Sequence, residues 1–143
     1  MTDNLRSIFD PHGDESLLEI ERLSFKSSAF SRRSILYHVR NNLVICAESK
    51  DKIVGYICLS PLTKRKRRRV YSIAVHPDHR KNGVAESLMV EAERKSKSRE
   101  IYLEVDVTNI GAIRLYTGLG YETFGRYVGY YGRTDALRMK KFI

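Results

Sequence analysis

The chain has 143 residues, of which 42% are hydrophobic and 30% are charged, a balance typical of a globular protein with a packed core. No apolar stretch approaches the roughly 20 residues that a membrane-spanning helix needs, and the first ten residues lack the features of a secretory signal. We therefore expect one domain over residues 1–143, in the cytoplasm and with no membrane partner. The formal net charge of +9 favours an anionic partner, such as a phosphorylated cofactor, a nucleic acid or a ribosome surface.

The two cysteines, Cys46 and Cys58, each lie within an apolar run that predicts a strand. Neither has a histidine close in sequence, so we expect small buried side chains in a reducing compartment rather than a catalytic nucleophile. The spacing of histidines and cysteines predicts no metal site.

The first part of the chain predicts one strand and two helices. In order, the expected elements are a strand over 5–9, a turn at 10–14, a helix over 15–23, a polar joint at 24–28 and a helix over 31–40. Ser31 is the expected N-cap of the second helix. Phe25 and Phe30 flank the joint, where they are either core residues or contacts for a substrate.

Two runs rich in Val, Ile and Tyr, 43–48 and 53–60, predict strands joined by a turn at 49–51. Six consecutive cations follow at residues 64–69. They form either a solvated hairpin loop or an electrostatic patch for RNA or an acidic partner. No aromatic residue interleaves with these cations, as base stacking would require, which favours the loop.

The centre of the chain is residues 70–91. An apolar run over 70–75 predicts a strand, a polar loop at 80–85 contains Gly83, and an amphipathic helix follows. A helix N-terminus has unpaired N–H groups and a partial positive charge, and the small residues Gly83 and Ala85 let a phosphate approach them. The alternative is an ordinary strand-to-helix turn. The loop matches neither the P-loop nor the dinucleotide-binding fingerprint.

The last part of the chain predicts further strands and one helix. These are a strand over 101–107, a helix over 110–119 that begins at the cap Thr108-Asn109 and ends in glycine, and strands over 121–130 and 135–142 around a turn at 132–134. The predicted order of elements is β-α-α-β-β-β-α-β-α-β-β.

Three strings of residues resemble one enzyme family. They are Arg80-x-x-Gly83-x-Ala85, then Leu103-Glu104-Val105-x-x-x-Asn109-x-x-Ala112-Ile113-x-Leu115-Tyr116-x-x-Leu119-Gly120-Tyr121, and then Tyr130-Tyr131-Gly132-x-x-x-Asp135-Ala136-x-x-Met139. The first is similar to the cofactor motif of the Gcn-five-related acyl-CoA N-acyltransferases. The other two resemble the branch of that family that acetylates protein N-termini. The resemblance spans about residues 43–142.

The resemblance implies an α/β fold: a single-domain acyl-CoA N-acyltransferase with a mixed, twisted sheet of about seven strands and helices on both faces. It also implies acetyl-CoA as co-substrate, no metal, and direct attack by the N-terminal α-amine of a protein or peptide in a ternary complex. Two alternatives stay open. One is the same chemistry on a lysine side chain or a small amine, and the other is a basic RNA- or ribosome-binding module without turnover.

Glu104 is the candidate base for this chemistry. In the strand over 101–107 it shares a face with Tyr102 and Asp106, opposite the apolar residues, so the pattern alone indicates a solvent-facing side chain. The resemblance implies instead that Glu104 is the general base, acting directly or through a water molecule. The task is mild, because an α-amine has a pKa of about 8 and roughly 10% of it is neutral at pH 7.

The resemblance also assigns the remaining candidate residues. Tyr116, two helical turns after Asn109, is expected to protonate the leaving thiolate, although core packing would also explain it. The resemblance implies that the cofactor's pantetheine is contacted by Ile73, Ala74 and Val75, and its pyrophosphate by Arg80, Lys81, Asn82, Gly83, Val84, Ala85 and Glu86. The thioester arm is contacted by Asn109 and Tyr116. The implied contacts with the acceptor are Phe25, Phe30, Tyr130 and Tyr131.

Overall fold

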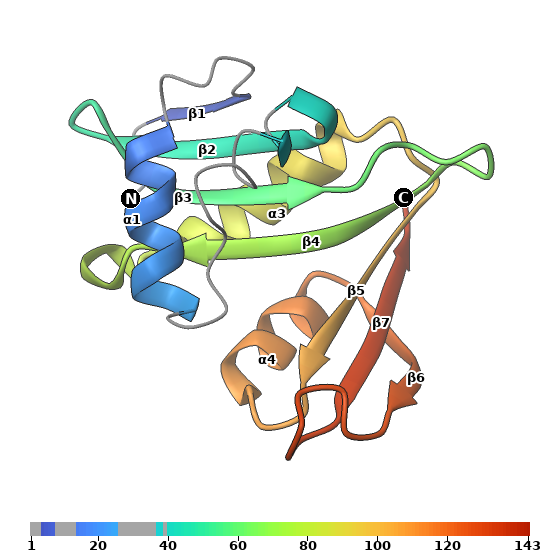
Figure 1. Cartoon of the computed structure of the whole chain (residues 1–143). Coiled ribbons are helices and arrows are strands. Elements are labelled where there is room, and N and C mark those ends of the chain that lie inside the picture. The colour runs from blue at the N-terminus through green and yellow to red at the C-terminus, as the bar shows by residue number, and fades with distance from the viewer. Residues whose placement is uncertain (1–3, 8–13, 26–36, 39) are drawn as a thin grey trace. The chain divides into compact units, whose positions relative to one another are not determined.

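The structure is a computed structural model that describes residues 4–7, 14–25, 37–38 and 40–143 (Figure 1). The chain forms two compact units. The first unit is Met1–Pro61 with Tyr71–Ser96, and the second unit is Leu62–Val70 with Lys97–Ile143. A single domain over 1–143 stays a prediction. Among the described residues, no helix has the length and apolar character required to cross a membrane.

Seven strands lie in the order β1-β2-β3-β4-β5-β7-β6, and strand β4 is divided between the two units. The strands are β1 (Asn4–Ser7), β2 (Leu43–Ser49), β3 (Lys52–Leu59), β4 (Arg67–Val75), β5 (Glu100–Asp106), β6 (Glu122–Tyr127) and β7 (Ala136–Phe142). The helices are α1 (Asp14–Phe25), α3 (Val84–Lys95), α4 (Ile110–Gly118) and the short 3-10 helix η3 (Pro77–His79). Strands β4 and β5 pair parallel, whereas β1 with β2, β2 with β3, β5 with β7 and β6 with β7 pair antiparallel, so the predicted mixed α/β sheet is confirmed.

In the first unit, β2 and β3 are buried along most of their length. Val44 lies opposite Cys58 and Ile45 lies opposite Ile57, so successive pairs point to opposite faces of the sheet. Burial of both faces explains why the two segments are continuous apolar runs in the sequence rather than alternating ones.

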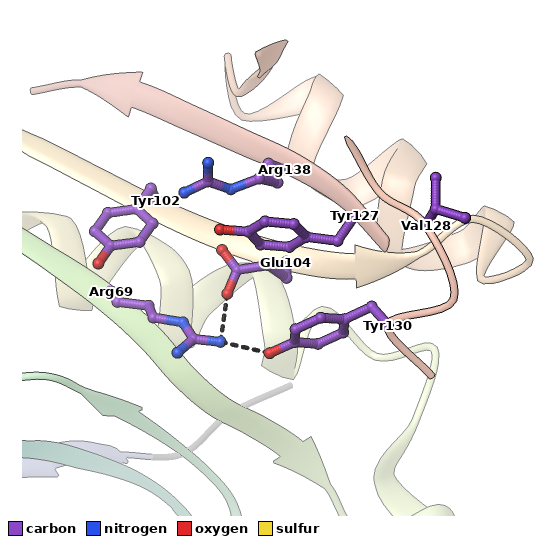
Figure 2. Close-up of a pocket in the computed structure, with 7 residues that line it drawn as sticks. All are labelled: Arg69, Tyr102, Glu104, Tyr127, Val128, Tyr130 and Arg138. Atoms are coloured by element: carbon purple, nitrogen blue, oxygen red, sulfur yellow. Dashed lines mark hydrogen bonds and ion pairs between the residues drawn. The ribbon is translucent and has the colours of Figure 1, made fainter. Parts of the chain in front are cut away.

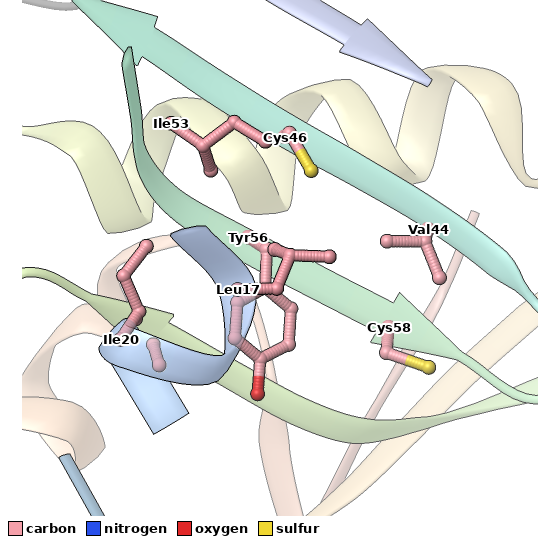
Figure 3. Close-up of a cluster of buried hydrophobic side chains, with 8 residues drawn as sticks. Leu17, Ile20, Val44, Cys46, Ile53, Tyr56 and Cys58 are labelled. Atoms are coloured by element: carbon pink, nitrogen blue, oxygen red, sulfur yellow. The ribbon is translucent and has the colours of Figure 1, made fainter. Parts of the chain in front are cut away.

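Helix α1 contributes the side chains that cover one of these faces (Figure 3). The buried cluster there consists of Leu17, Ile20, Val44, Cys46, Ile53, Tyr56, Cys58 and Ala74. Helix α3 covers the opposite face, where Gly55 lies. A Cβ atom on Gly55 would come within 3.1 Å of both Val84 Cγ1 and the Ala74 carbonyl oxygen, so β3 packs against α3 at a distance that suits glycine. The predicted covering of both faces by helices is confirmed.

In the second unit, β5 alternates as its sequence predicts. Ile101, Leu103 and Val105 are buried, and the residues between them are less so. Strand β5 pairs antiparallel with β7, and β7 pairs antiparallel with β6. The first residues of β4, 67–69, pair parallel with residues 100–102 of β5.

Helix α4 begins and ends as the sequence predicts. Asn109 Oδ1 accepts a hydrogen bond from the Ala112 N–H at 3.2 Å, which makes Asn109 the N-cap. At the other end Gly120 has a φ of 96°, and the Tyr121 N–H donates to the Tyr116 carbonyl at 2.9 Å. This is the Schellman arrangement that a glycine exit favours.

The prediction that residues 64–69 form one loop is wrong for its second half. Residues 64–66 are exposed in a turn, but residues 67–69 belong to β4. The physical reason is charge pairing across strands: Arg67 Nε lies 2.5 Å from Glu100 Oε2, and Arg69 pairs with Glu104. A run of cations can therefore continue a strand when alternate members meet carboxylates.

The prediction that one strand spans 121–130 is also wrong, because β6 ends at Tyr127. Tyr130 and Tyr131 lie in a turn before β7. Gly129 and Gly132 have φ angles of 63° and 81°, which break the strand, and the Gly129 N–H donates to Asp135 Oδ1 at 2.8 Å.

The predicted second helix and the joint before it fall largely outside the described residues. Residues 37, 38, 40 and 41 are helical. Phe25 is the last residue of α1, and its side chain, like all of Phe30, lies outside the described part of the chain.

Candidate functional site

The second unit holds a pocket of about 410 Å³ on the sheet face that carries the polar residues of β5 (Figure 2). Its walls come from four strands and from the turn between β6 and β7, so no short window of sequence contains it. The lining residues are Arg69, Tyr102, Glu104, Tyr127, Val128, Tyr130 and Arg138.

Glu104 contributes an enclosed carboxylate to this pocket. The prediction that it shares the polar face of β5 is confirmed, but only 4% of its side chain is exposed, so it is not solvent-facing. Oε1 pairs with the Arg69 guanidinium, whereas Oε2 is buried without a hydrogen-bond partner among the described residues. A buried oxygen without a partner is destabilising, so Oε2 is free to accept a hydrogen bond from a donor that enters the pocket.

Arg69 connects three parts of the second unit. Its Nη2 atom pairs with Glu104 Oε1 and also donates a hydrogen bond to the Tyr130 hydroxyl at 2.9 Å (Figure 2). Arg69 lies opposite Tyr102 in the parallel register of β4 and β5, which places its side chain on the same face as Glu104. This bridge holds the β6–β7 turn beside the Glu104 carboxylate.

Arg138 lies directly opposite Glu104 in the register of β5 and β7. Its guanidinium carbon is 4.6 Å from the ring centroids of both Phe124 and Tyr127, within the range of cation–π attraction. Its Nε atom is buried and has no hydrogen-bond partner among the described residues. Arg138 also has no ion pair within the part of the chain that the structure describes.

Arg69, Arg138, Tyr102 and Tyr127 were not predicted as site residues. A signal for two of them was present, because period-two alternation through the strands would place Arg69 and Arg138 on defined faces. Which of those faces meets Glu104 depends on strand register, and register between distant strands is a property of the tertiary structure.

Tyr130 lines the pocket, and Tyr131 follows it in the same turn. The Tyr130 ring stacks on Tyr127 at 5.5 Å between centroids, and the Tyr131 ring meets Tyr130 edge-on at 4.9 Å. Burial raises the pKa of Tyr131 above its usual value, and electrostatic interactions with Tyr130, Asp106 and Glu104 raise it further. Tyr130 lines the pocket; contact of either tyrosine with an acceptor stays a prediction.

Tyr116 is buried within α4, with 6% of its surface exposed, and its ring meets Tyr121 edge-on. Burial, with a smaller effect from Tyr131, raises the pKa of Tyr116 to about 12. The phenol therefore keeps its proton throughout the neutral range. Asn109 has the capping role described above, and its contact with pantetheine stays a prediction.

The candidate cofactor residues of the first unit lie at the end of β4, in the loop after it and in the first turn of α3. Ala74 and Val75 are buried, and Ile73 precedes them in the strand. Arg80 Nε donates to the Val75 carbonyl at 3.0 Å, and Arg80 Nη2 donates to Ser24 Oγ at 3.3 Å. Arg80 thus anchors the start of the loop to the strand end and to α1.

Gly83 forms the corner where this loop enters α3. It is the N-cap of the helix at φ 78°, it supplies no side-chain cap, and a Cβ atom built on it would meet nothing within 4 Å. Lys81 and Asn82 beside it are exposed. The corner leaves open space in front of the first helical turn, where backbone N–H groups attract an anion.

The described residues contain no group of three or more His, Cys, Asp or Glu side chains that could hold a metal ion. Both cysteines are buried, as predicted. The pKa of the Cys58 thiol is raised to about 11, mainly by burial. The charge of Glu21 adds a smaller rise, whereas a hydrogen bond from Asn42 lowers the pKa. A thiol in this state is a poor nucleophile.

Comparison with known sequences identifies the family. The sequence profile described as "Acetyltransferase (GNAT) family" matches residues 9–121. The chain belongs to the GNAT family. This confirms the family predicted from the motifs. The GNAT chain is 32% identical to N-alpha-acetyltransferase 30 of Homo sapiens over 136 residues, which cover 87% of this chain and 38% of that protein. It spans 27–40% of the length of the first curated relatives that it matches.

Solved structures share its fold. The ribosomal-protein-S18-alanine N-acetyltransferase from Escherichia coli superposes with a TM-score of 0.88 at 20% identity, over 98% of this chain and 93% of that one. An aminoglycoside 6'-N-acetyltransferase complexed with coenzyme A superposes with a TM-score of 0.87 at 18% identity, over 97% and 96%. At these identities the likeness shows the GNAT fold alone.

Proposed function

We propose that this chain transfers an acetyl group from acetyl-CoA to the N-terminal α-amine of a protein or peptide. The observation that carries the proposal is the buried Glu104 carboxylate, whose Oε2 has no hydrogen-bond partner among the described residues and lies in a pocket lined by tyrosines and arginines. Membership of the GNAT family supports acetyl transfer. Similarity to N-alpha-acetyltransferase 30 over most of the chain supports the α-amine as acceptor.

The loop after β4 fits the pyrophosphate of acetyl-CoA. The left-handed corner at Gly83 is open, and the N–H groups of Val84, Ala85 and Glu86 follow in the first turn of α3. The exposed Lys81 and Asn82 add polar contacts, and Ile73, Ala74 and Val75 offer backbone groups to the pantetheine arm. When bound, acetyl-CoA supplies the acetyl group as a thioester.

Glu104 and Tyr116 divide the proton transfers. Glu104 Oε2 accepts a proton from the α-amine, directly or through a water molecule, and Arg69 holds the carboxylate in place. Tyr116 carries the proton that the leaving sulfur needs, and a phenol with a pKa of about 12 keeps that proton at neutral pH until the thiolate forms. The burial of both thiols supports direct transfer in a ternary complex, without a cysteine intermediate, and suits a reducing cytoplasm.

The test uses a peptide with a free N-terminus and an internal lysine, beside a twin that is blocked at its N-terminus. Mass spectrometry should find acetyl on the α-amine of the first peptide and little on the second, because a lysine with a pKa near 10.4 is mostly protonated at neutral pH. Equal modification of the blocked twin would show that the acceptor is the lysine side chain and not the α-amine. Acetylation of small amines in preference to both peptides would point to the other alternative.

The catalytic roles have their own test. Glu104→Gln and Tyr116→Phe should each lower kcat by on the order of 10²-fold, the usual worth of a proton-transfer group. Calorimetry should show acetyl-CoA binding unchanged in both. Wild-type turnover in the double variant would show that neither side chain takes part in the reaction.

We also propose the exposed cations Lys64, Arg65 and Lys66 as the contact with a ribosome or RNA. Replacing all three with glutamine should leave acetylation of short peptides unchanged and abolish the salt-dependent part of RNA binding. Unchanged RNA binding would exclude these residues as the contact. Loss of activity on short peptides would place them in the acceptor site instead.

A further inference from the structure

All of the formal net charge of this chain resides in the second unit. Residues 62–70 and 97–143 contain fourteen Lys or Arg and five Asp or Glu, a net charge of +9, whereas the first unit contains twelve of each. The unit that holds the pocket is therefore strongly basic. Such a field raises the local concentration of anionic ligands and repels cationic ones.

Within the pocket, the charges do not cancel. Arg69 and Glu104 form an ion pair, which leaves the cation Arg138 as the remaining formal charge among the lining residues. Arg138 has no ion pair in the described part of the chain, and its buried Nε atom lacks an acceptor. A buried guanidinium donor without a partner is destabilising, so a ligand oxygen bound there would remove that penalty.

The Arg138 side chain is also held in position. Its guanidinium lies 4.6 Å from the centroids of Phe124 and Tyr127, and Tyr127 in turn stacks on Tyr130. Cation–π contacts restrict the long side chain before any ligand arrives, so little conformational entropy is lost on binding. The donor is preorganised.

Two of the buried polar atoms that lack a hydrogen-bond partner among the described residues, Glu104 Oε2 and Arg138 Nε, come from residues directly opposite each other on neighbouring strands. The Cβ atoms of such a pair are about 4.5–5.5 Å apart, so both side chains lie within reach of a single amino-acid residue. Oε2 is complementary to an N–H donor, and Nε is complementary to an oxygen. An α-amine with a nearby carboxylate offers both groups.

We propose that Arg138 binds a side-chain carboxylate of the acceptor, so that the pocket selects peptides whose first residue is Asp or Glu. This inference rests on the proposed function, in which Glu104 receives the α-amine. A neutral carbonyl oxygen also accepts a hydrogen bond from Arg138, but a carboxylate adds the opposite charge and makes the stronger, charge-assisted bond. Arg138 is thus a specificity-determining residue.

The experiment compares peptides that differ only in the first residue: Asp, Asn, Glu or Gln. The kcat/KM for the acidic peptide should exceed that for its amide twin by about tenfold, the lower end of what a hydrogen bond to a charged group contributes. Arg138→Gln should reduce that ratio to about one, and Arg138→Lys should retain part of it. Arg133→Gln is the matched control, because it removes one exposed cation from the same unit and should keep the full ratio.

Binding of the same peptides without acetyl-CoA, measured by calorimetry, separates this inference from the proposed function. The Asp peptide should bind more tightly than the Asn peptide, and Arg138→Gln should abolish the difference while circular dichroism shows an unchanged fold. Equal binding of acidic and amide peptides to the wild-type chain would overturn the inference even if both are acetylated. A preference that persists in Arg138→Gln would equally overturn it. Acetylation of lysine only, with the binding preference intact, would overturn the proposed function and leave Arg138 as the carboxylate contact.

Discussion

The ion pair between Arg69 and Glu104 allows a quantitative test that does not depend on the proposed reaction. Arg69→Met removes the charge and keeps an unbranched apolar stem. It leaves the Glu104 carboxylate, which is 4% exposed, without its counter-charge. Breaking a fully buried pair costs about 3–5 kcal/mol. Because the Arg69 side chain is 32% exposed, solvent screens part of the attraction between the two charges. We therefore expect Arg69→Met to lower the free energy of unfolding by about 1–3 kcal/mol.

A double-mutant cycle isolates the pair. Arg69→Met and Glu104→Gln should each destabilise the protein, and the double variant should lose less than the sum, with a coupling energy of about 1–2 kcal/mol. The chain has no tryptophan, so urea unfolding is best followed by far-UV circular dichroism. Because the carboxylate is enclosed, most of the coupling should persist in 0.5 M salt.

The matched control is the ion pair of Arg94 and Glu91 on α3, in which the Arg94 side chain is 67% exposed and the Glu91 side chain is 15% exposed. Arg94→Gln should leave the unfolding midpoint unchanged within error. A coupling energy of zero between Arg69 and Glu104, or an Arg69→Met variant as stable as the wild type, would refute the claim that the pocket depends on this pair.

Three further predictions follow from burial and backbone geometry. Tyr116 has a pKa of about 12 in the folded chain and about 10 when unfolded, so the stability tied to its neutral form is fully present below pH 10 and lost as the pH rises toward 12. Urea unfolding between pH 9 and 11.5 should show a steeper decline for the wild type than for Tyr116→Phe, and equal slopes would contradict the assignment. Gly55→Ala should lower the unfolding free energy by about 1–3 kcal/mol through overpacking, whereas Gly111→Ala, whose Cβ meets nothing within 4 Å, should not lower it; thermal unfolding of both variants decides. Gly83→Val forces a β-branched residue to φ 78° and should raise the Kd of acetyl-CoA in calorimetry, while Gly83→Asn, which tolerates that φ, should raise it less; unchanged affinity in a folded Gly83→Val variant would remove the loop from the cofactor site.

Local patterns in the sequence were sufficient for much of the fold. The alternation of β5 placed Glu104 on the polar face, and the N-cap and glycine exit of α4 lie where Asn109 and Gly120 predict them. The strand–loop–helix order around Gly83 is also local. Each of these features depends on residues within a few positions of one another, where steric preference and side-chain periodicity act without the rest of the chain.

The surroundings of Glu104 depend on strands far apart in sequence. Nothing local shows that Arg69, in a run of six cations, continues β4 and meets a carboxylate 35 positions later, or that Arg138 lies opposite that same carboxylate. Gly129 and Gly132 end β6 early and bring Tyr130 within 2.9 Å of Arg69. By itself the sequence determined the family, the order of the strands and of helices α1, α3 and α4 in the described part of the chain, and the face that Glu104 occupies. Only the tertiary structure decided that this face is a pocket in which Arg69 pairs with Glu104, while Arg69 Nε, Glu104 Oε2 and Arg138 Nε have no hydrogen-bond partner among the described residues. The reason is that strand register sets which distant side chains meet.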